Sequence, residues 1–362
     1  MIKLEFIDSI LTEARAGGQP HPEDSIFDGS AAAKQAVESL QYVIKNPSSV
    51  TIKWDGFPAL IFGRLNDGRF TIQDKYMFDA KFFADSPAKW EEYDLQKKSA
   101  KTRPDLYAKL ANIWKGLEAA VGSSTGFFWG DLLWWDKLNP VKGMYVFKPN
   151  VVEYHISTKT QLGMQIGKSV GGLVVHQYFA DDNAKPVQWN GQGLKRDGSV
   201  VILTPSAGLT FTLDDPVQLS KAAINAVNQY GNLVDQFLGG LDGVAAQAIQ
   251  KYTNKRITGQ TNEDVVDWLK ANVSGKQYSK LVGEDGNGYL VQNQKGLEGL
   301  FKIWNAVYAF KVNLAHQLEQ QVQGIQQYVN GQPQGEGFVF NTPHGLVKLV
   351  NRGTFSAALF SK

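Results

Sequence analysis

The sequence predicts an α+β protein in which a mainly antiparallel sheet is interrupted by a large α-helical insertion. Between residues 50 and 203, short runs rich in β-branched and aromatic residues alternate with turn residues, which is typical of antiparallel strands. From residue 214 to 330, apolar residues recur at helical spacing instead. Strand-like runs return after residue 336. We therefore expect one domain built from residues 1–213 and 331–362, and a helical insertion domain over 214–330.

The first half of the chain carries local signals for each element. A short helix is expected over 4–14. Ser30 is a candidate N-cap for a helix over 31–45, which Asn46 and Pro47 would end. The strands 59–62 and 69–72 flank Asn66-Asp67-Gly68 and predict a hairpin. A helix should begin at Pro104 and reach Val121. Further strands are expected at 127–133, 144–147, 151–156, 172–179 and 199–203.

The second half is predicted to be helical until shortly before its end. Helices are expected over 218–238, 244–252, 263–273 and 296–329. The last of these has the clearest apolar stripe, which indicates a face buried in a core rather than a ligand site. Gly331 to Gly335 would end it. Two final strands are expected at 337–341 and 346–351.

Composition limits the classes of function. The chain has 362 residues, no cysteine and a net charge of +2. Thiolate chemistry and disulfides are therefore excluded, and any contact with nucleic acid must come from a local basic patch. No apolar run approaches the roughly 20 residues of a membrane span, and no secretion signal is visible at the N-terminus. We expect a monomeric cytoplasmic protein without membrane contact, in the host cytoplasm if the chain is viral.

The segment 51–56 reads Thr-Ile-Lys-Trp-Asp-Gly and is the most informative stretch of the chain. Lys53 follows a buried strand, and Asp55-Gly56 turns the chain directly after it. A lysine at this position should be partly desolvated, which would lower its pKa and free the amine to act as a nucleophile. The alternative is a solvated lysine that closes a hairpin.

Three further segments extend this pattern. Lys53-Trp54-Asp55-Gly56 resembles motif I of the covalent nucleotidyltransferases, the superfamily of ATP-dependent RNA ligases, DNA ligases and mRNA capping enzymes. The segment 126–133, which contains Asp131, resembles motif III, and Glu336-Gly337 resembles motif IV. The strand around Lys348 resembles motif V. The resemblance is to RNA ligases above all, with a phage as one conceivable source. It implies a nucleotidyltransferase core, an ATP-grasp-like ligase fold.

The resemblance also implies roles for individual residues in forming a lysyl-AMP. Lys53 would attack the α-phosphate of ATP, and Asp55 would orient it or hold a hydrated metal. Glu336 would bind the catalytic Mg²⁺, with Mn²⁺ as the alternative ion. Lys348 would neutralise the α-phosphate. The family usually has a second lysine two residues later, where this chain has Val350, so Arg352 is a candidate replacement.

Other residues would contact the nucleotide in less specific ways. Asp131 stands where the family has a glutamate that hydrogen-bonds the ribose. Lys75 lies where a basic residue contacts phosphate. On the strand 172–179, His176, Tyr178 and Phe179 are candidates to stack on adenine, and alternation places His176 and Tyr178 on one face. Ile52 and Gly56, on either side of the nucleophile, complete the expected binding set.

The expected substrate is a 5′-phosphorylated nucleic acid, which would be sealed to a 3′-hydroxyl end. The chain stops soon after Lys348, which leaves no room for the OB-fold domain that follows motif V in DNA ligases and capping enzymes. RNA is therefore favoured over DNA. A basic cluster at Lys97, Lys98, Lys101 and Arg103 suits a phosphate backbone. The alternatives are an ATP-dependent DNA ligase, a capping-type guanylyltransferase, or a non-catalytic nucleic-acid-binding protein with a degenerate core.

Overall fold

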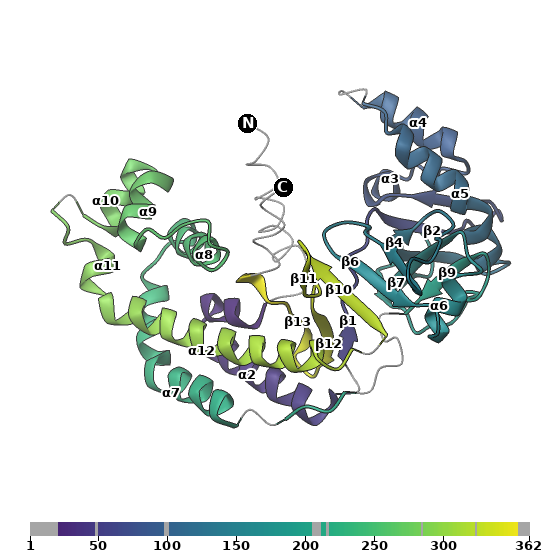
Figure 1. Cartoon of the computed structure of the whole chain (residues 1–362). Coiled ribbons are helices and arrows are strands. Elements are labelled where there is room, and N and C mark those ends of the chain that lie inside the picture. Colours follow the sequence, from purple (N-terminus) through teal and green to yellow (C-terminus); the bar gives the residue numbers. More distant parts are fainter. Residues whose placement is uncertain are drawn as a thin grey trace. The chain divides into compact units, whose positions relative to one another are not determined.

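The computed structural model describes residues 21–47, 50–97, 101–204, 211–214, 217–283, 285–322 and 324–353. The helix expected over 4–14 lies outside these residues. The chain separates into two compact units, each with its own core (Figure 1). Unit 1 draws its residues from Met1–Thr51, Leu209–Gln321 and Gly337–Lys362. Unit 2 draws them from Ile52–Gly208 and Val322–Glu336.

Unit 1 is mainly helical. Its helices are η1 (Pro22–Asp28), α2 (Ser30–Lys45), α7 (Val217–Gly239), α8 (Gly243–Ile257), α9 (Val265–Asn272), α10 (Gly275–Leu281), α11 (Tyr289–Gln292) and α12 (Gln294–Glu319). The helices α7 and α12 pack along each other, and α2 contacts both (Figure 1). Close approach depends on Gly296, where an added Cβ would lie 2.5 Å from Cβ of Phe237. The expected stripe on α12 is thus a buried face.

The helical segment does not form the separate insertion domain that we expected. It shares unit 1 with α2 from the N-terminal region and with the last strands of the chain. Asp235 of α7 accepts hydrogen bonds from the Ser30 backbone N–H and hydroxyl at 2.7 and 2.6 Å, which ties α7 to the start of α2. The amphipathic stripes show which faces are buried but do not identify the partner, and here the partners come from both ends of the chain.

A buried charge network also joins distant parts of unit 1. The Lys311 ammonium of α12 donates to the Glu23 carboxylate at 2.5 Å, and both side chains are fully buried. Arg352 donates to Glu23 at 3.3 Å and to Asp24 at 2.9 Å. Removing one member of such a network leaves a buried charge without its partner, so the network fixes the register of these segments.

Unit 1 also contains a three-stranded sheet in the order β1-β12-β13. Its strands are β1 (Val50–Ile52), β12 (Phe338–Thr342) and β13 (Gly345–Leu349). The hydroxyl of Thr51 donates to the carbonyl of Val339 at 2.8 Å, which connects β1 to β12. The final two strands therefore form as predicted, within two residues of the expected ends.

Unit 2 is built on a six-stranded sheet in the order β3-β2-β4-β7-β8, with β9 beside β7. Its strands are β2 (Ala59–Arg64), β3 (Phe70–Gln73), β4 (Gly126–Trp134), β7 (Gly171–Phe179), β8 (Val187–Gln188) and β9 (Val200–Leu203). All neighbouring strands are antiparallel except β7 and β9. The predicted hairpin and the mainly antiparallel pairing are thus confirmed.

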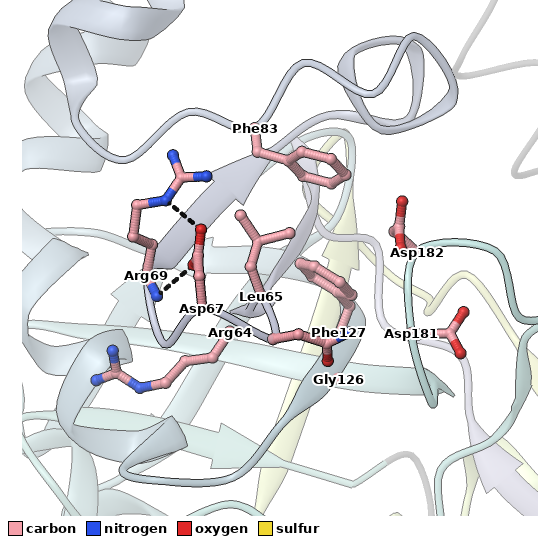
Figure 2. A pocket seen from close by; sticks show the side chains of 10 residues that line it. Arg64, Leu65, Asp67, Arg69, Phe83, Gly126, Phe127, Asp181 and Asp182 are labelled. Atoms are coloured by element: carbon pink, nitrogen blue, oxygen red, sulfur yellow. Dashed lines mark hydrogen bonds and ion pairs between the residues drawn. The ribbon is translucent and has the colours of Figure 1, made fainter.

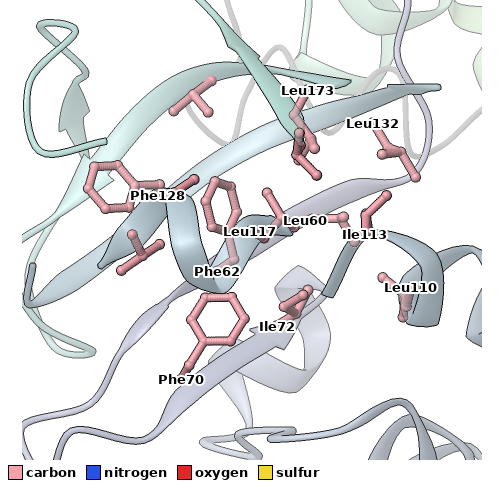
Figure 3. Close-up of a cluster of buried hydrophobic side chains, with 14 of the residues drawn as sticks. Leu60, Phe62, Phe70, Ile72, Leu110, Ile113, Leu117, Phe128, Leu132 and Leu173 are labelled. Atoms are coloured by element: carbon pink, nitrogen blue, oxygen red, sulfur yellow. The ribbon is translucent and has the colours of Figure 1, made fainter. Parts of the chain in front are cut away.

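The largest core of unit 2 lies on one face of this sheet. Phe62 of β2, Phe128 of β4 and Leu173 of β7 project from the strands toward Leu117, and all four side chains are buried (Figure 3). Leu117 belongs to α5 (Pro104–Val121), which forms over the predicted range and packs beside α4 (Pro87–Gln96). The opposite face of the sheet carries α3 (Lys75–Asp79), whose Phe78 packs on Phe127 and Phe179.

A second sheet of unit 2 has the order β11-β10-β6-β5. It consists of β5 (Met144–Phe147), β6 (Glu153–Ser157), β10 (Ile325–Val329) and β11 (Gln332–Pro333), and α6 (Gln161–Ile166) packs on it. The helix expected to reach residue 329 instead ends at Glu319, and β10 pairs with β6. Asn330 and Gly331 have φ values of 50° and 76° and form the turn between β10 and β11.

These elements confirm the α+β class. None of the helices in the described ranges is both long enough and apolar enough to cross a membrane.

Candidate functional site

Lys53 and Glu336 form an ion pair in unit 2, although 283 positions separate them in the sequence. Lys53 follows β1 directly, and Glu336 comes shortly after β11. The Lys53 ammonium donates to Oε1 of Glu336. The two side chains keep 26% and 12% of their surface exposed, so a small molecule can reach the lysine while most of the pair is desolvated.

The charge around Lys53 is negative overall. Burial lowers the pKa of Lys53, but the carboxylates of Glu336, Asp131 and Asp55 together outweigh burial, and the pKa lies above its ordinary value. We had expected desolvation alone to decide this pKa and to free the amine. That expectation is wrong because three carboxylates stabilise the ammonium form. A pKa above the ordinary lysine value favours the ammonium form of Lys53 at neutral pH.

Glu336 is the carboxyl group most affected by this crowding. Burial raises the pKa of Glu336 to about 7, and the charges of Asp55 and Asp131 act in the same direction, against the attraction of Lys53. Its second oxygen, Oε2, is buried and has no hydrogen-bond partner in the described structure. Glu336 can therefore accept a proton near neutral pH, and it has one oxygen available for a further ligand.

Asp55 organises the loop rather than offering oxygen atoms to a ligand. Its Oδ1 accepts from the Asn150 side chain at 2.8 Å, and its Oδ2 accepts from the backbone N–H groups of Val151 and Val152 at 2.5 and 2.7 Å. Its own backbone N–H donates to the Tyr154 hydroxyl at 2.6 Å. The expected metal-binding role of Asp55 is thus not supported, because three donors already occupy a 5% exposed carboxylate. Its contribution to the Lys53 site is its charge and the position of the turn.

Asn150 and Tyr154 are residues that sequence reasoning missed at this site. The Tyr154 ring lies 5.0 Å from that of Trp54 and is fully buried. Alternation along the strand over 151–156 could have indicated that Tyr154 points inward, but no pattern in the sequence connects it with Asp55.

Gly56 allows the lysine loop to pass directly over β4. A Cβ at Gly56 would lie 2.5 Å from the Cβ of Asp131. Phe57 donates from its backbone N–H to the carbonyl of Leu132 at 2.9 Å and so continues the pairing of β2 with β4. The Asp-Gly pair is therefore explained by close packing of two chain segments. Ile52 is buried, so only its backbone could contact a nucleotide.

Asp131 is held by His176, at 2.9 Å from Oδ2 to the imidazole Nε2. The two residues project from the sheet face opposite the largest core, and both remain partly exposed. An Asp–His pair beside Lys53 offers polar groups for a ribose or phosphate oxygen.

Tyr178 does not share a face with His176. Gly130 of β4 pairs with Val175 and Trp129 pairs with Gln177, so β7 has one extra residue at His176. This β-bulge shifts the alternation, and Tyr178 packs on Phe128 in the main core at a ring distance of 5.1 Å. The expectation that Tyr178 stacks on adenine is therefore corrected.

The other three basic residues that were expected to contact phosphate lie in different environments. Lys75 is exposed in the first turn of α3, which Asp74 caps by accepting from the Met77 N–H at 2.9 Å. Lys348 lies on β13 of unit 1, opposite Val339. Arg352, also in unit 1, is 8% exposed and bound to Glu23 and Asp24, so the structure gives it a role in the core of unit 1 rather than as a phosphate ligand.

Two members of the basic cluster predicted at 97–103, Lys97 and Arg103, are paired with an acid, whereas Lys101 is exposed. Arg103 donates to Asp94 at 2.7 and 2.9 Å, and Lys97 pairs with the same carboxylate at 3.4 Å. Lys98 lies outside the described residues. These ion pairs join α4 to the start of α5, so the cluster is a structural link between helices.

A cavity of about 340 Å³ lies at the other end of the main sheet from Asp131. It is bounded by Leu65, by the facing rings of Phe83 and Phe127, and by the carboxylates of Asp181 and Asp182 (Figure 2). Its position excludes Lys53 and Glu336 from its lining, so we do not assign it to the same site.

In the described part of the chain, no group of three or more His, Asp or Glu side chains is arranged to hold a metal ion. The Lys53 site can still contribute carboxylate oxygens, because Glu336 has its free Oε2 and Asp131 is partly exposed. Mg²⁺ commonly takes only one or two protein carboxylates and completes its shell with water and substrate phosphates, so these residues fit that ion.

Comparison with known proteins gives a family but no activity. No curated protein matches the chain, and no solved structure matches it. One family model covers residues 20–362, which is most of the sequence. The chain therefore belongs to that family, DUF6267, a family of unknown function.

Proposed function

We propose that this protein is an ATP-dependent nucleotidyltransferase that forms a lysyl-AMP on Lys53 and transfers the AMP to a 5′-phosphorylated polynucleotide end, which it then seals. The observation that carries the proposal is the contact between Lys53 and Glu336. These are the residues that resemble the nucleophile and the metal-binding carboxylate of the covalent nucleotidyltransferases, and Asp131 lies within electrostatic reach of both.

The charges at the site suggest how the lysine becomes reactive. Lys53 must lose a proton before it can attack, and the hydrogen-bonded Glu336, with a pKa of about 7, is the nearest acceptor. The neutral amine then attacks the α-phosphorus, and a nitrogen–phosphorus bond forms. The bond from that phosphorus to the oxygen bridging to the β-phosphate breaks, and pyrophosphate leaves with the electron pair.

The remaining residues would bind and orient the nucleotide. Asp131, held by His176, is suited to a ribose hydroxyl. Glu336 Oε2 and Asp131 would hold a Mg²⁺, which supplies charge compensation for the phosphates. RNA ends remain the favoured substrate.

Covalent labelling tests the proposal. The protein is incubated with Mg²⁺ and ATP labelled in the α-phosphate, denatured, and analysed for protein-bound label and for the modified peptide. We expect label on Lys53 and none in Lys53→Ala. Lys137→Ala, which removes an exposed lysine of the same unit, is the matched control and should label normally.

Two results would contradict the proposal. One is label on a different lysine in the wild-type protein. The other is the absence of label with each of the four ribonucleoside triphosphates, with either Mg²⁺ or Mn²⁺. Binding of nucleic acid without any labelling would favour the alternative of a non-catalytic nucleic-acid-binding protein.

A further inference from the structure

Two aromatic side chains are unusual in their exposure. Phe57 and Tyr76 keep 61% and 74% of their surface exposed, and every other aromatic residue in the described ranges is buried or half-buried. Burying a phenylalanine side chain normally contributes about 1.5–3 kcal/mol, so a folded chain gains little by displaying one. The exposure leaves both rings accessible to a ligand.

Both rings stand at the same end of the main sheet of unit 2. Phe57 precedes β2 and Tyr76 follows β3, and these strands are antiparallel, with Ile61 opposite Gln73 as the last pair at that end. Asp131 lies at this end of β4, opposite Ala59. The pair Phe57 and Tyr76, which we call the aromatic pair, thus adjoins the loop that carries Lys53.

Hydrogen bonds fix the backbone from which both rings project. Phe57 donates to the Leu132 carbonyl at 2.9 Å, and Leu132 donates back to the Pro58 carbonyl at 3.0 Å. Tyr76 lies in the first turn of α3, whose N-cap Asp74 accepts from Met77. An aromatic side chain has only two rotatable bonds, so an exposed ring on a fixed backbone loses little side-chain entropy when a base stacks on it.

We propose that the aromatic pair and Lys75 bind a single-stranded segment of the nucleic-acid substrate, with unpaired bases stacked on the two rings and a phosphate on Lys75. This inference rests on the proposed function, which places a polynucleotide end at Lys53. Pro58 and Met77, beside the rings in sequence, are buried. Exposed rings beside a lysine are the combination with which proteins hold unpaired bases and their phosphates.

Binding of a fluorescein-labelled 12-nucleotide single strand, RNA or DNA, tests the inference by fluorescence anisotropy. Phe57→Ala and Tyr76→Ala should each raise Kd by about 5- to 150-fold, the range of stacking on one base. Tyr76→Phe keeps the ring and should bind as the wild type does. Val187→Ala, at another exposed apolar residue of unit 2, is the matched control and should leave Kd unchanged. Lys75→Ala should reduce the slope of log Kd against log salt concentration by about 1, the contribution of one phosphate contact.

The outcomes separate this inference from the proposed function. Equal binding by the wild type and both alanine variants, or no binding by the wild type, would overturn the inference even if Lys53 labels with AMP. A higher KM for ATP in the alanine variants, with Kd for the strand unchanged, would assign the rings to the nucleotide and would also overturn it. Strand binding that depends on both rings would support it, even if the wild type shows no labelling with AMP.

Discussion

Glu336→Gln should have opposite effects on two reactions of Lys53. The substitution keeps the shape of the side chain and removes the negative charge that holds the Lys53 ammonium. The pKa of Lys53 should fall, because burial then acts against fewer carboxylates. A larger fraction of Lys53 becomes neutral, and the lysine should react faster with a simple acylating reagent. AMP transfer should become slower, because the amide that replaces the carboxylate neither accepts the lysine proton nor supplies the negative charge that the proposed Mg²⁺ site needs.

The structure sets the expected magnitudes. A hydrogen bond between charged groups contributes about 1.5–3 kcal/mol, and each 1.4 kcal/mol changes the neutral fraction about tenfold. Lys53 keeps 26% of its side chain exposed, so solvent screening favours the lower value, and acylation should accelerate about tenfold. Loss of a catalytic metal ligand should slow AMP transfer on the order of 10²-fold or more.

Pulse acetylation at pH 7.5 followed by peptide mass spectrometry measures the first rate, and labelling with α-labelled ATP measures the second. The exposed pair of Lys89 and Glu92 is a matched control in the same unit. Glu92→Gln should change acetylation of Lys89 by less than about twofold, because exposed ion pairs contribute little. If Lys53 in Glu336→Gln were acetylated no faster than in the wild type, the electrostatic account of this site would be refuted.

Two further predictions test packing and pH dependence. Gly56→Ala should lower the free energy of unfolding by about 1–3 kcal/mol in urea and also reduce AMP labelling, because the new Cβ meets Asp131. Gly275→Ala, at the start of α10 where an added Cβ meets open space, should not lower the free energy of unfolding and should leave labelling unchanged. Burial raises the pKa of Glu319 to about 7, so between roughly pH 4.5 and 7 the native state binds more protons than the unfolded state, and stability falls as pH rises. Glu319→Gln should therefore raise Tm at pH 8 but leave it nearly unchanged at pH 4.5, and an equal shift at both values would contradict this assignment.

The sequence predicted helices and strands well where residues within the segment define its ends and its buried face. The helix α5 forms over the expected residues because Pro104 and an amphipathic stripe define it. The strand β10 was missed because the Gln-rich segment 320–329 lacks a clear local preference and gains its strand conformation by pairing with β6, about 170 residues earlier. The division into units was missed for a similar reason, since α7 and α12 find partners in α2 and in the last strands of the chain.

The candidate site shows the same limit at the level of single residues. The resemblance to motifs I and IV predicted that Lys53 and Glu336 share one site, and the structure places the two side chains in contact. Alternation failed for Tyr178, because a bulge at His176 cannot be recognised without the partner strand. The motif resemblance misplaced Arg352 as well, since the buried acids Glu23 and Asp24 that bind it lie more than 300 residues away.

The error about the pKa of Lys53 is the most instructive for mechanism. Burial of a lysine near a strand end suggests a free amine, but the neighbouring acids are contributed by β4, by the Asp55 loop and by the segment before Gly337, and they reverse the outcome. A site with three carboxylates and one ammonium would keep a nucleophilic Lys53 protonated until charge is compensated. Cations bound to a nucleotide would offset the negative charge of the carboxylates around Lys53 and so favour loss of its proton. Reactivity would then begin only when the nucleotide is bound, which protects the lysine from unproductive chemistry in the free protein.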